Sequence, residues 1–263
     1  MRKNLLRERL KAGEPSFGTH ILSSWPGIVE IVGHTGVFDY VEFVSEYAPY
    51  DLLGLENIAR GLELSGMSAL MKIDQEPRTY LAAKALGAGI QNILFSDVRT
   101  VEDAKECVGA VRADLPGTLG RRGAGSTRDI GYVMGGASAD WVQSTLDSVV
   151  MLMIEKKEAV ENLDAILSVE GVDMVQFGPG DYSVSIGKAG SRNDPEIVEA
   201  QRHTIQTALK KGVQPRAEIG TPEAAESYLK MGVRHFCLGT DVHLLFQWWK
   251  KNGALLREIV KGA

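Results

Sequence analysis

Two carboxylates stand just after short apolar runs in the second half of the chain. Glu155 directly follows Met153-Ile154, and Asp181 follows Phe177 after three intervening residues. If both runs are buried strands of one parallel sheet, the two carboxylates lie at the C-terminal ends of neighbouring strands and can face the same site. Two hard oxygen ligands with room for water and substrate suit Mg²⁺ or Mn²⁺ rather than zinc. The alternative is that Glu155 caps the following helix and Asp181 is a turn residue.

The segment Gly178-Pro179-Gly180-Asp181 adds a second kind of chemistry. Glycine lets the backbone approach a ligand closely. N–H groups exposed at such a turn can hold a carboxylate. The segment therefore predicts a small carboxylic acid bound beside the metal.

These residues need a scaffold in which successive strands end on one side. Apolar runs typical of buried strands alternate with helical patterns such as Thr100–Arg112, Lys157–Val169, Pro195–Lys211 and Pro222–Met231. The runs are Phe17–Leu22, Tyr40–Val44, Ala69–Ile73, Asn92–Phe95, Val149–Ile154, Met174–Phe177, Pro215–Ile219 and His235–Leu238. This alternation favours a closed (β/α)8 TIM barrel over an open, doubly wound sheet. We expect residues 1–263 to form a single α/β barrel domain, with an extra N-terminal helix at Asn4–Lys11 closing one end.

Composition and charge exclude several classes of protein. The chain has 263 residues, 44% of them hydrophobic, and a net charge of −5, which provides no basic field for nucleic acid or an anionic membrane. Its longest strongly apolar run, Val149–Ile154, is far shorter than the roughly 20 residues that span a bilayer. Cys107 and Cys237 lie far apart and make no metal or redox spacing, which is typical of a reducing cytoplasm.

Two segments stand outside the strand–helix rhythm. Residues 117–138 hold seven glycines and the adjacent Arg121 and Arg122. We expect this loop to follow the fourth strand and to fold over the mouth of the barrel. Near the C-terminus, Trp248 and Trp249 begin an amphipathic helix. Two adjacent tryptophans exceed what one helix face of a monomer needs, so they predict an interface helix and a homo-oligomer.

Residues 154–187, IEKKEAVENLDAILSVEGVDMVQFGPGDYSVSIG, resemble the metal-site signature of the HpcH/HpaI aldolase family. KAGEPSFG, FDYVEFVSEYAPYD and LGRRG, beginning at residues 11, 38 and 119, resemble other segments of that family. The resemblance implies a (β/α)8 barrel, commonly assembled as a hexamer, with class II aldolase activity on acids such as 4-hydroxy-2-oxoheptanedioate. We therefore expect a homo-oligomer, either a hexamer or a trimer. The resemblance also implies that Glu155 and Asp181 bind the divalent metal and that backbone N–H groups of Gly180 and Asp181 hold the carboxylate of the oxo acid.

The chain departs from the family pattern at several positions. The family's Asp-x-Glu-His after strand two is here Val44-Ser45-Glu46-Tyr47, and an Asp that supports this His corresponds to Gly87. The family's Arg on strand three is Lys72, which keeps the charge but loses the bidentate fork. A Gln before the metal Glu is Met153, and a pocket-lining Leu on strand seven is Glu218. The residues expected to bind the metal and the oxo acid match the family pattern, whereas those expected to transfer protons differ from it.

Four polar residues are candidates for the rebuilt catalytic groups. His20 stands where the family has an aromatic residue, and Glu42 stands where it has an apolar one, two residues before Val44 and on the same side of the strand. A carboxylate inside a barrel needs a partner, so His20, Glu42 and Lys72 are predicted to form one cluster, with His20 and Glu42 replacing the base. The alternative is a structural ion pair. Tyr47 is a candidate acid, because an ordinary pKa near 10 makes it a poor base.

The predicted function is that of a metal-dependent carbon–carbon lyase of the aldolase type. Pyruvate or a similar 2-oxo acid would be the enolate donor, and an aldehyde would be the second substrate. Mg²⁺ or Mn²⁺, with Co²⁺ as a further candidate, would polarise the oxo acid. Lys72 would place positive charge beside the enolate, Arg121 or Arg122 would help close the mouth, and Glu218 would line the substrate pocket. The alternatives are a 2-oxo acid decarboxylase or hydrolase on the same platform, and a non-catalytic protein that binds metal and oxo acid.

Overall fold

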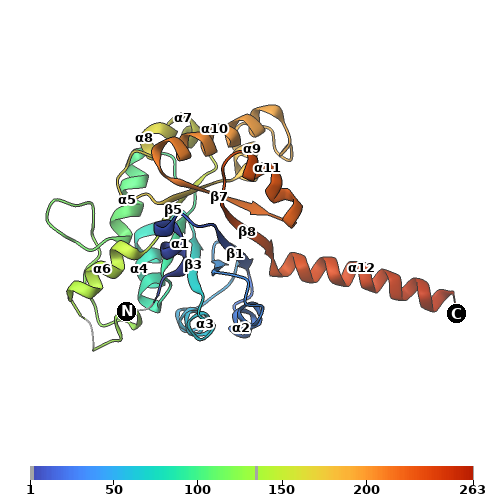
Figure 1. Cartoon of the computed structure of the whole chain (residues 1–263), viewed down its shortest axis with the longest axis horizontal. Helices are drawn as coiled ribbons and strands as arrows, with labels where there is room; N and C mark the ends of the chain where they lie inside the picture. Colours follow the sequence, from blue (N-terminus) through green and yellow to red (C-terminus); the bar gives the residue numbers. More distant parts are fainter. Residues whose placement is uncertain (1–2, 134–135, 263) are drawn as a thin grey trace.

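Eight parallel strands close into a barrel, in the computed structural model that describes residues 3–133 and 136–262 (Figure 1). Each strand pairs with the next in the sequence, and β8 pairs with β1. The strands are β1 (Ser16–Ile21), β2 (Tyr40–Val44), β3 (Ser68–Ile73), β4 (Asn92–Phe95), β5 (Val150–Ile154), β6 (Met174–Phe177), β7 (Gln214–Ile219) and β8 (His235–Thr240). The predicted (β/α)8 barrel is confirmed, and the strand positions match the apolar runs to within two residues.

Helices cover the outside of the barrel, and one closes its N-terminal end. They are α1 (Leu5–Ala12), α2 (Gly27–His34), α3 (Leu52–Leu64), α4 (Arg78–Ala88), α5 (Val101–Val111), η1 (Arg128–Ile130), α6 (Ala139–Asp147), α7 (Lys157–Glu161), α8 (Leu163–Ile166), α9 (Pro179–Ser185), α10 (Pro195–Lys211), η2 (Pro222–Ala224), α11 (Ala225–Lys230) and α12 (Asp241–Lys261). The expected single helix over residues 157–169 is divided at Asn162, whose side-chain amide donates to the Arg99 carbonyl.

The interior of the barrel has an apolar side and a charged side. Inward side chains, most of them from β3 to β6, form a buried apolar cluster, and Leu6 of α1 packs against it at the N-terminal end of the barrel. The members of this cluster are Leu6, Tyr40, Leu70, Leu94, Val149, Met151, Met153 and Met174. On the side of β7, β8, β1 and β2, the buried residues include Arg216, Cys237, His20 and Glu42. This division gathers the buried charges on one side of the barrel interior.

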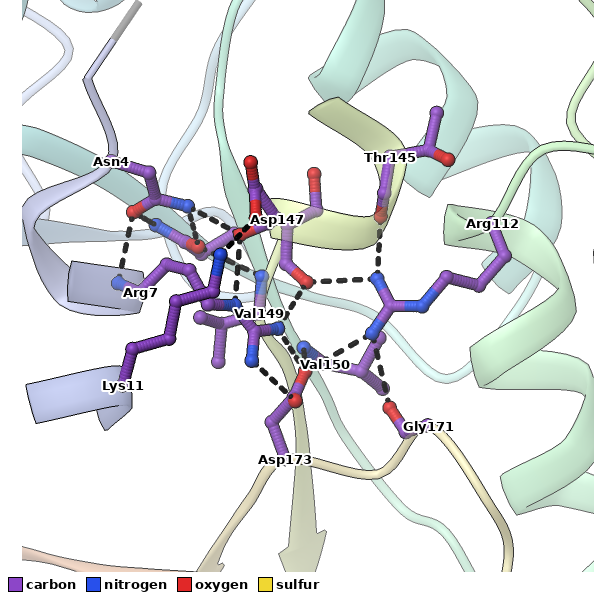
Figure 2. Close-up of polar contacts among 12 residues, drawn as sticks. Asn4, Arg7, Lys11, Arg112, Thr145, Asp147, Val149, Val150, Gly171 and Asp173 are labelled. Atoms are coloured by element: carbon purple, nitrogen blue, oxygen red, sulfur yellow. Dashed lines mark hydrogen bonds and ion pairs between the residues drawn. The ribbon is translucent and has the colours of Figure 1, made fainter. Parts of the chain in front are cut away.

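A polar network ties the N-terminal ends of β5 and β6 to the surrounding helices (Figure 2). Both terminal nitrogens of Arg7, on α1, donate to the Asp173 carboxylate at 2.7 and 2.6 Å. Arg112 donates to Asp173 at 3.1 Å and to the carbonyls of Thr145 and Ser148. Asp173 also accepts from the backbone N–H of Val150. One carboxylate therefore holds together α1, the end of α5 and the start of β5.

Residues 117–133 and 136–138 lie at this same N-terminal end, and the prediction that the loop over 117–138 folds over the mouth of the barrel is wrong for these described residues. The loop follows α5 rather than β4, and α5 has already carried the chain back from the mouth. Arg122 forms an ion pair with Asp129, lies 5.9 Å from the Trp141 ring and lines a pocket with Arg7 and Lys11. Gly135 lies outside the described residues.

Helix α12 extends away from the barrel (Figure 1). Its first residue, Asp241, accepts hydrogen bonds from the N–H groups of Leu22 and Ser23, which anchors the helix beside the end of β1. Beyond this anchor, Trp248 and Trp249 are 63% and 60% exposed, as are most of the helix's large apolar side chains. None of the helices in the described ranges has the length and apolar character needed to cross a membrane.

Replacing Asp173 with Asn should lower the free energy of unfolding by about 3 kcal/mol, because two arginines would lose the partner that compensates their burial. Chemical denaturation at neutral pH measures this loss. Asp164→Asn is the matched control, since the Asp164 side chain is exposed in its pair with Lys211 and should matter little. Equal stability of the two variants would contradict the role given to Asp173.

Candidate active site

A cavity of about 840 Å³ opens at the C-terminal ends of the strands. The predicted residues that line it are His20, Glu42, Tyr47, Lys72, Glu155, Gly180, Asp181 and Glu218. Arg122 does not line this cavity. It lies at the N-terminal end of the barrel, because its loop follows α5, which returns the chain to that end. The barrel thus brings together residues on or just beyond β1, β2, β3, β5 and β7 with the first turn of α9.

Glu155, just beyond β5, is buried and held in place by the backbone. Its Oε1 accepts from the Asp97 N–H at 2.9 Å, and Asp97 adopts a left-handed φ of 57° at the end of β4. Burial raises the pKa of Glu155, although the charge of Lys72 and the Asp97 N–H oppose this rise. A Cβ at Gly178 would lie 2.7 Å from Glu155 Oε2, so glycine at this position leaves room for the carboxylate. The site favours a cation that stabilises the charged form of Glu155.

Asp181 stands in the first turn of α9 with its side chain half exposed. Lys156 lies 3.3 Å from the Asp181 carboxylate and 3.2 Å from that of Asp97. A Cβ at Gly180 would lie 3.3 Å from Arg192 Nη2, so this guanidinium covers Gly180 inside the cavity. Two carboxylates facing one cavity are donors of the kind that Mg²⁺ and Mn²⁺ prefer, so the residues present fit a divalent cation.

Lys72 is turned toward the loop after β2. Its ammonium lies 2.6 Å from Glu46 Oε2, donates to the Tyr47 hydroxyl at 3.3 Å and lies 5.0 Å from the centre of the Tyr47 ring. Burial by itself lowers the pKa of Lys72, but the charges of Glu155 and Glu46 outweigh burial and raise that pKa. Lys72 is therefore charged at neutral pH, as the sequence predicted.

Tyr47 carries its proton at neutral pH. Burial raises the pKa of its hydroxyl, against the opposing charge of Lys72. The ring is otherwise exposed toward the cavity opening. Tyr47 is therefore suited to donate a proton and not to accept one.

His20, Glu42 and Lys72 do not form the single cluster that the sequence predicted. His20 lies between two carboxylates, with Nε2 3.4 Å from Glu42 Oε1 and Nδ1 3.4 Å from Glu218 Oε1. Burial lowers the pKa of His20, but Cys237, Glu42 and Glu218 outweigh burial and raise it well above 6.5. The imidazole is thus held in its charged form, a poor state for a general base.

Sequence reasoning missed Arg216 and Cys237. Arg216 forms a buried ion pair with Glu42 and donates from Nε to Gln176 Oε1 at 2.7 Å. Its position two residues before Glu218 on the same strand was a usable signal, because residues two apart share a face. Cys237 lies beside His20, a contact that no sequence spacing reveals.

A family model described as HpcH/HpaI aldolase/citrate lyase matches residues 54–247. The chain belongs to this family. A hydroxypyruvate/pyruvate aldolase of Roseobacter denitrificans is 30% identical over 257 residues, 95% of this chain and 96% of the relative. A 4-hydroxy-2-oxo-heptane-1,7-dioate aldolase of Escherichia coli is 30% identical, covering 92% of this chain and 91% of the relative. The crystal structure of an HpcH/HpaI aldolase from Desulfitobacterium hafniense has a TM-score of 0.86 at 28% identity, covering 97% of this chain and 98% of that one.

These findings confirm the resemblance inferred from the signature segment, and with it an enzyme of the aldolase and lyase class. The match includes both Glu155 and Asp181, and it also includes Lys72 and Glu218, two of the positions at which the sequence predicts a departure from the family pattern. The roles of individual residues stay predictions.

The His20 arrangement predicts a pH-dependent stability. Because the folded-state pKa of His20 is raised, its contribution is fully present below its unfolded pKa near 6.5 and is lost as pH rises through the folded value. His20→Gln should therefore destabilise the protein more at about pH 6 than at about pH 9. Denaturant unfolding at both pH values, with a chelator present, measures the difference. His203→Gln, at an exposed position on α10, is the control. A His20→Gln effect that is the same at both pH values would contradict the charged imidazole.

Proposed function

We propose that this family member is a metal-dependent carbon–carbon lyase that cleaves or forms 4-hydroxy-2-oxo acids, with pyruvate or a similar 2-oxo acid as enolate donor and an aldehyde as partner. The observation that carries the proposal is the convergence of Glu155, Asp181 and Lys72 on one cavity at the C-terminal ends of the strands. Barrel enzymes carry out their chemistry at that end. The aldolase names of relatives that span nearly the whole chain support the same reaction class.

The cation in this proposal is Mg²⁺ or Mn²⁺, with Co²⁺ as a further candidate, and Glu155 and Asp181 would hold it. When bound, such an ion supplies Lewis-acid polarisation of the oxo acid, which stabilises a developing enolate. The Asp97 N–H fixes one oxygen of Glu155, so this carboxylate is oriented before any ligand arrives. Lys156 balances part of the negative charge of Asp97 and Asp181.

The chain's own residues would bind the oxo acid and stabilise its charge. Backbone N–H groups at Gly180 and Asp181 would hold the carboxylate, and the Arg192 guanidinium over Gly180 adds positive charge there. Lys72 would place a second positive charge beside the enolate oxygen, held in that position by Glu46 and Tyr47. Glu218, with its side chain 51% exposed to the cavity, would contact the second substrate.

The groups that could move a proton favour a second candidate reaction as well. Tyr47 and His20 both carry their protons at neutral pH, since both pKa values are raised. Decarboxylation of a 2-oxo diacid forms an enolate and then needs a proton donor. Aldol cleavage also needs a base, which removes the proton of the C4 hydroxyl as the bond between C3 and C4 breaks and that oxygen becomes the aldehyde carbonyl. Measuring free pyruvate from a 4-hydroxy-2-oxo acid and from a 2-oxo diacid, with and without added aldehyde, separates lyase, decarboxylase and non-catalytic binding.

Activity should require the divalent cation, and a chelator should abolish it. Asp181→Asn and Glu155→Gln each remove a charged ligand and should weaken Mn²⁺ binding in titration calorimetry by at least about tenfold. Glu161→Gln, an exposed change on α7, is the control. Unchanged Mn²⁺ affinity in both site variants would refute the assigned ligands, whatever the activity.

We further propose that the protein is a homo-oligomer, a hexamer or a trimer, in a reducing cytoplasm. The exposed apolar face of α12, with Trp248 and Trp249, supports the first point. Two free, buried cysteines support the second. Light scattering at micromolar concentration should give the mass of an oligomer. Trp248→Glu with Trp249→Glu should reduce it, and the exposed Lys251→Glu should not. A monomeric wild-type protein would rule the oligomer out.

A further inference from the structure

The charged side of the barrel interior contains three side chains with different metal-binding atoms. His20 on β1, Glu42 on β2 and Cys237 on β8 each offer one ligand atom, and these atoms lie within 4.8 Å of one another. All three residues are buried. The barrel register brings them together, because His20 pairs with Glu42 across β1 and β2, and β1 is also paired with β8. This group shares no residue with the Glu155 and Asp181 pair.

The surroundings of His20 resemble those of a metal-binding imidazole. Nε2, on the side of Glu42, is buried and makes no hydrogen bond of ordinary geometry among the described residues. Nδ1 faces the Glu218 carboxylate at 3.4 Å. Histidine ligands typically donate their second ring N–H to a carboxylate, which fixes the tautomer and leaves the first nitrogen for the metal. Glu218 occupies that supporting position.

We propose that His20 Nε2, Glu42 Oε1 and Cys237 Sγ form a second metal site, for a borderline-soft divalent ion of which Zn²⁺ is the type. A nitrogen, an oxygen and a sulfur ligand select zinc-class ions, whereas Mg²⁺ prefers oxygen ligands alone. Arg216 holds the other oxygen of Glu42, so Oε1 is the atom left for a metal. The proposal does not depend on the lyase activity.

The charge of the cluster stays balanced when such an ion binds. Without an ion, His20 and Arg216 lie against the carboxylates of Glu42 and Glu218, so two basic side chains face two acidic ones beside Cys237. Binding of the ion displaces one proton from the His20 imidazolium and one from the Cys237 thiol, so two positive charges leave as two arrive. Ligands must be deprotonated in this way for any zinc-class site. The buried cluster therefore gains the ion with no net change of charge.

An ion has a path to this site and an open position once it is there. His20 and Glu42 line the large cavity, whereas Cys237 lies behind them. Three protein ligands leave the fourth position of a tetrahedral site free, as in catalytic zinc centres. That position would face the cavity, on the side of Glu218 and away from the apolar inner surface of β3 to β6.

The test uses Co²⁺ as a spectroscopic substitute for zinc in the full chain, reduced, stripped of metal and then saturated with Mg²⁺ to occupy the oxygen site. Co²⁺ should produce a thiolate-to-cobalt charge-transfer band in the near ultraviolet at one equivalent. Cys237→Ser should lose this band, whereas Cys107→Ala, a change of the other buried cysteine, and Asp181→Asn should keep it. Glu218→Gln should weaken Co²⁺ binding about 10–100-fold and still give the band at saturation.

A measurement on the unmodified chain covers the case in which Cys237→Ser fails to fold. X-ray absorption at the zinc edge, after loading one equivalent of Zn²⁺ in the presence of Mg²⁺, should show one sulfur scatterer at about 2.3 Å. A zinc shell of oxygen and nitrogen alone, or a charge-transfer band that survives in folded Cys237→Ser, would overturn the site. None of these measurements uses lyase activity as its readout. A failed test of the zinc-class site therefore leaves the proposed lyase function standing, and a failed test of the lyase leaves the zinc-class site standing.

Discussion

A charge inside a closed barrel must be compensated inside that barrel, because the sheet and its helical shell keep water away. The ion pair between Arg216 and Glu42 meets this requirement across the interior from β7 to β2. On the neighbouring strand β6, Gln176 accepts a hydrogen bond from Arg216. His20 lies beside Oε1 of Glu42, whereas Arg216 pairs with Oε2. Glu218 completes the set by facing His20 from the cavity. Without the Arg216 and Glu42 pair, His20 and Gln176 would each lose one of their partners in the barrel interior.

The two ends of the barrel separate stability from chemistry. At the N-terminal end, Asp173 collects two arginines and a backbone N–H from three parts of the chain, and α1 covers the apolar interior with Leu6. At the C-terminal end, the carboxylates of Glu155 and Asp181 face a cavity and are only partly compensated by protein groups. A network in which every polar group has a hydrogen-bond partner stabilises the fold. Carboxylates whose negative charge the protein balances only in part are suited to bind a cation.

The contacts of Lys72 and Tyr47 determine the charge on one side of the candidate active site. Lys72 directs its compact ammonium to Glu46 and Tyr47. The arginine that the resemblance implies at this position would instead present a planar guanidinium able to contact two oxygens at once. Tyr47 carries its proton at neutral pH, because burial raises the pKa of its hydroxyl. The cavity therefore holds the two carboxylates of Glu155 and Asp181 together with a charged Lys72 and a protonated Tyr47.

The sequence by itself determined the strands, their order and the two carboxylates that follow β5 and β6, because apolar runs and helix signals are local and a parallel barrel places every strand end on one side. It also indicated the exposed tryptophans of α12. Only the tertiary structure decided which side chains meet across strands that are distant in sequence. It paired Arg216 with Glu42 and brought Cys237 beside His20. It also separated Lys72 from His20 and Glu42, and it placed residues 117–133 and 136–138 at the N-terminal end of the barrel. Such contacts depend on the register of the closed sheet and on which end each helix returns to, and neither is encoded in the spacing of residues along the chain.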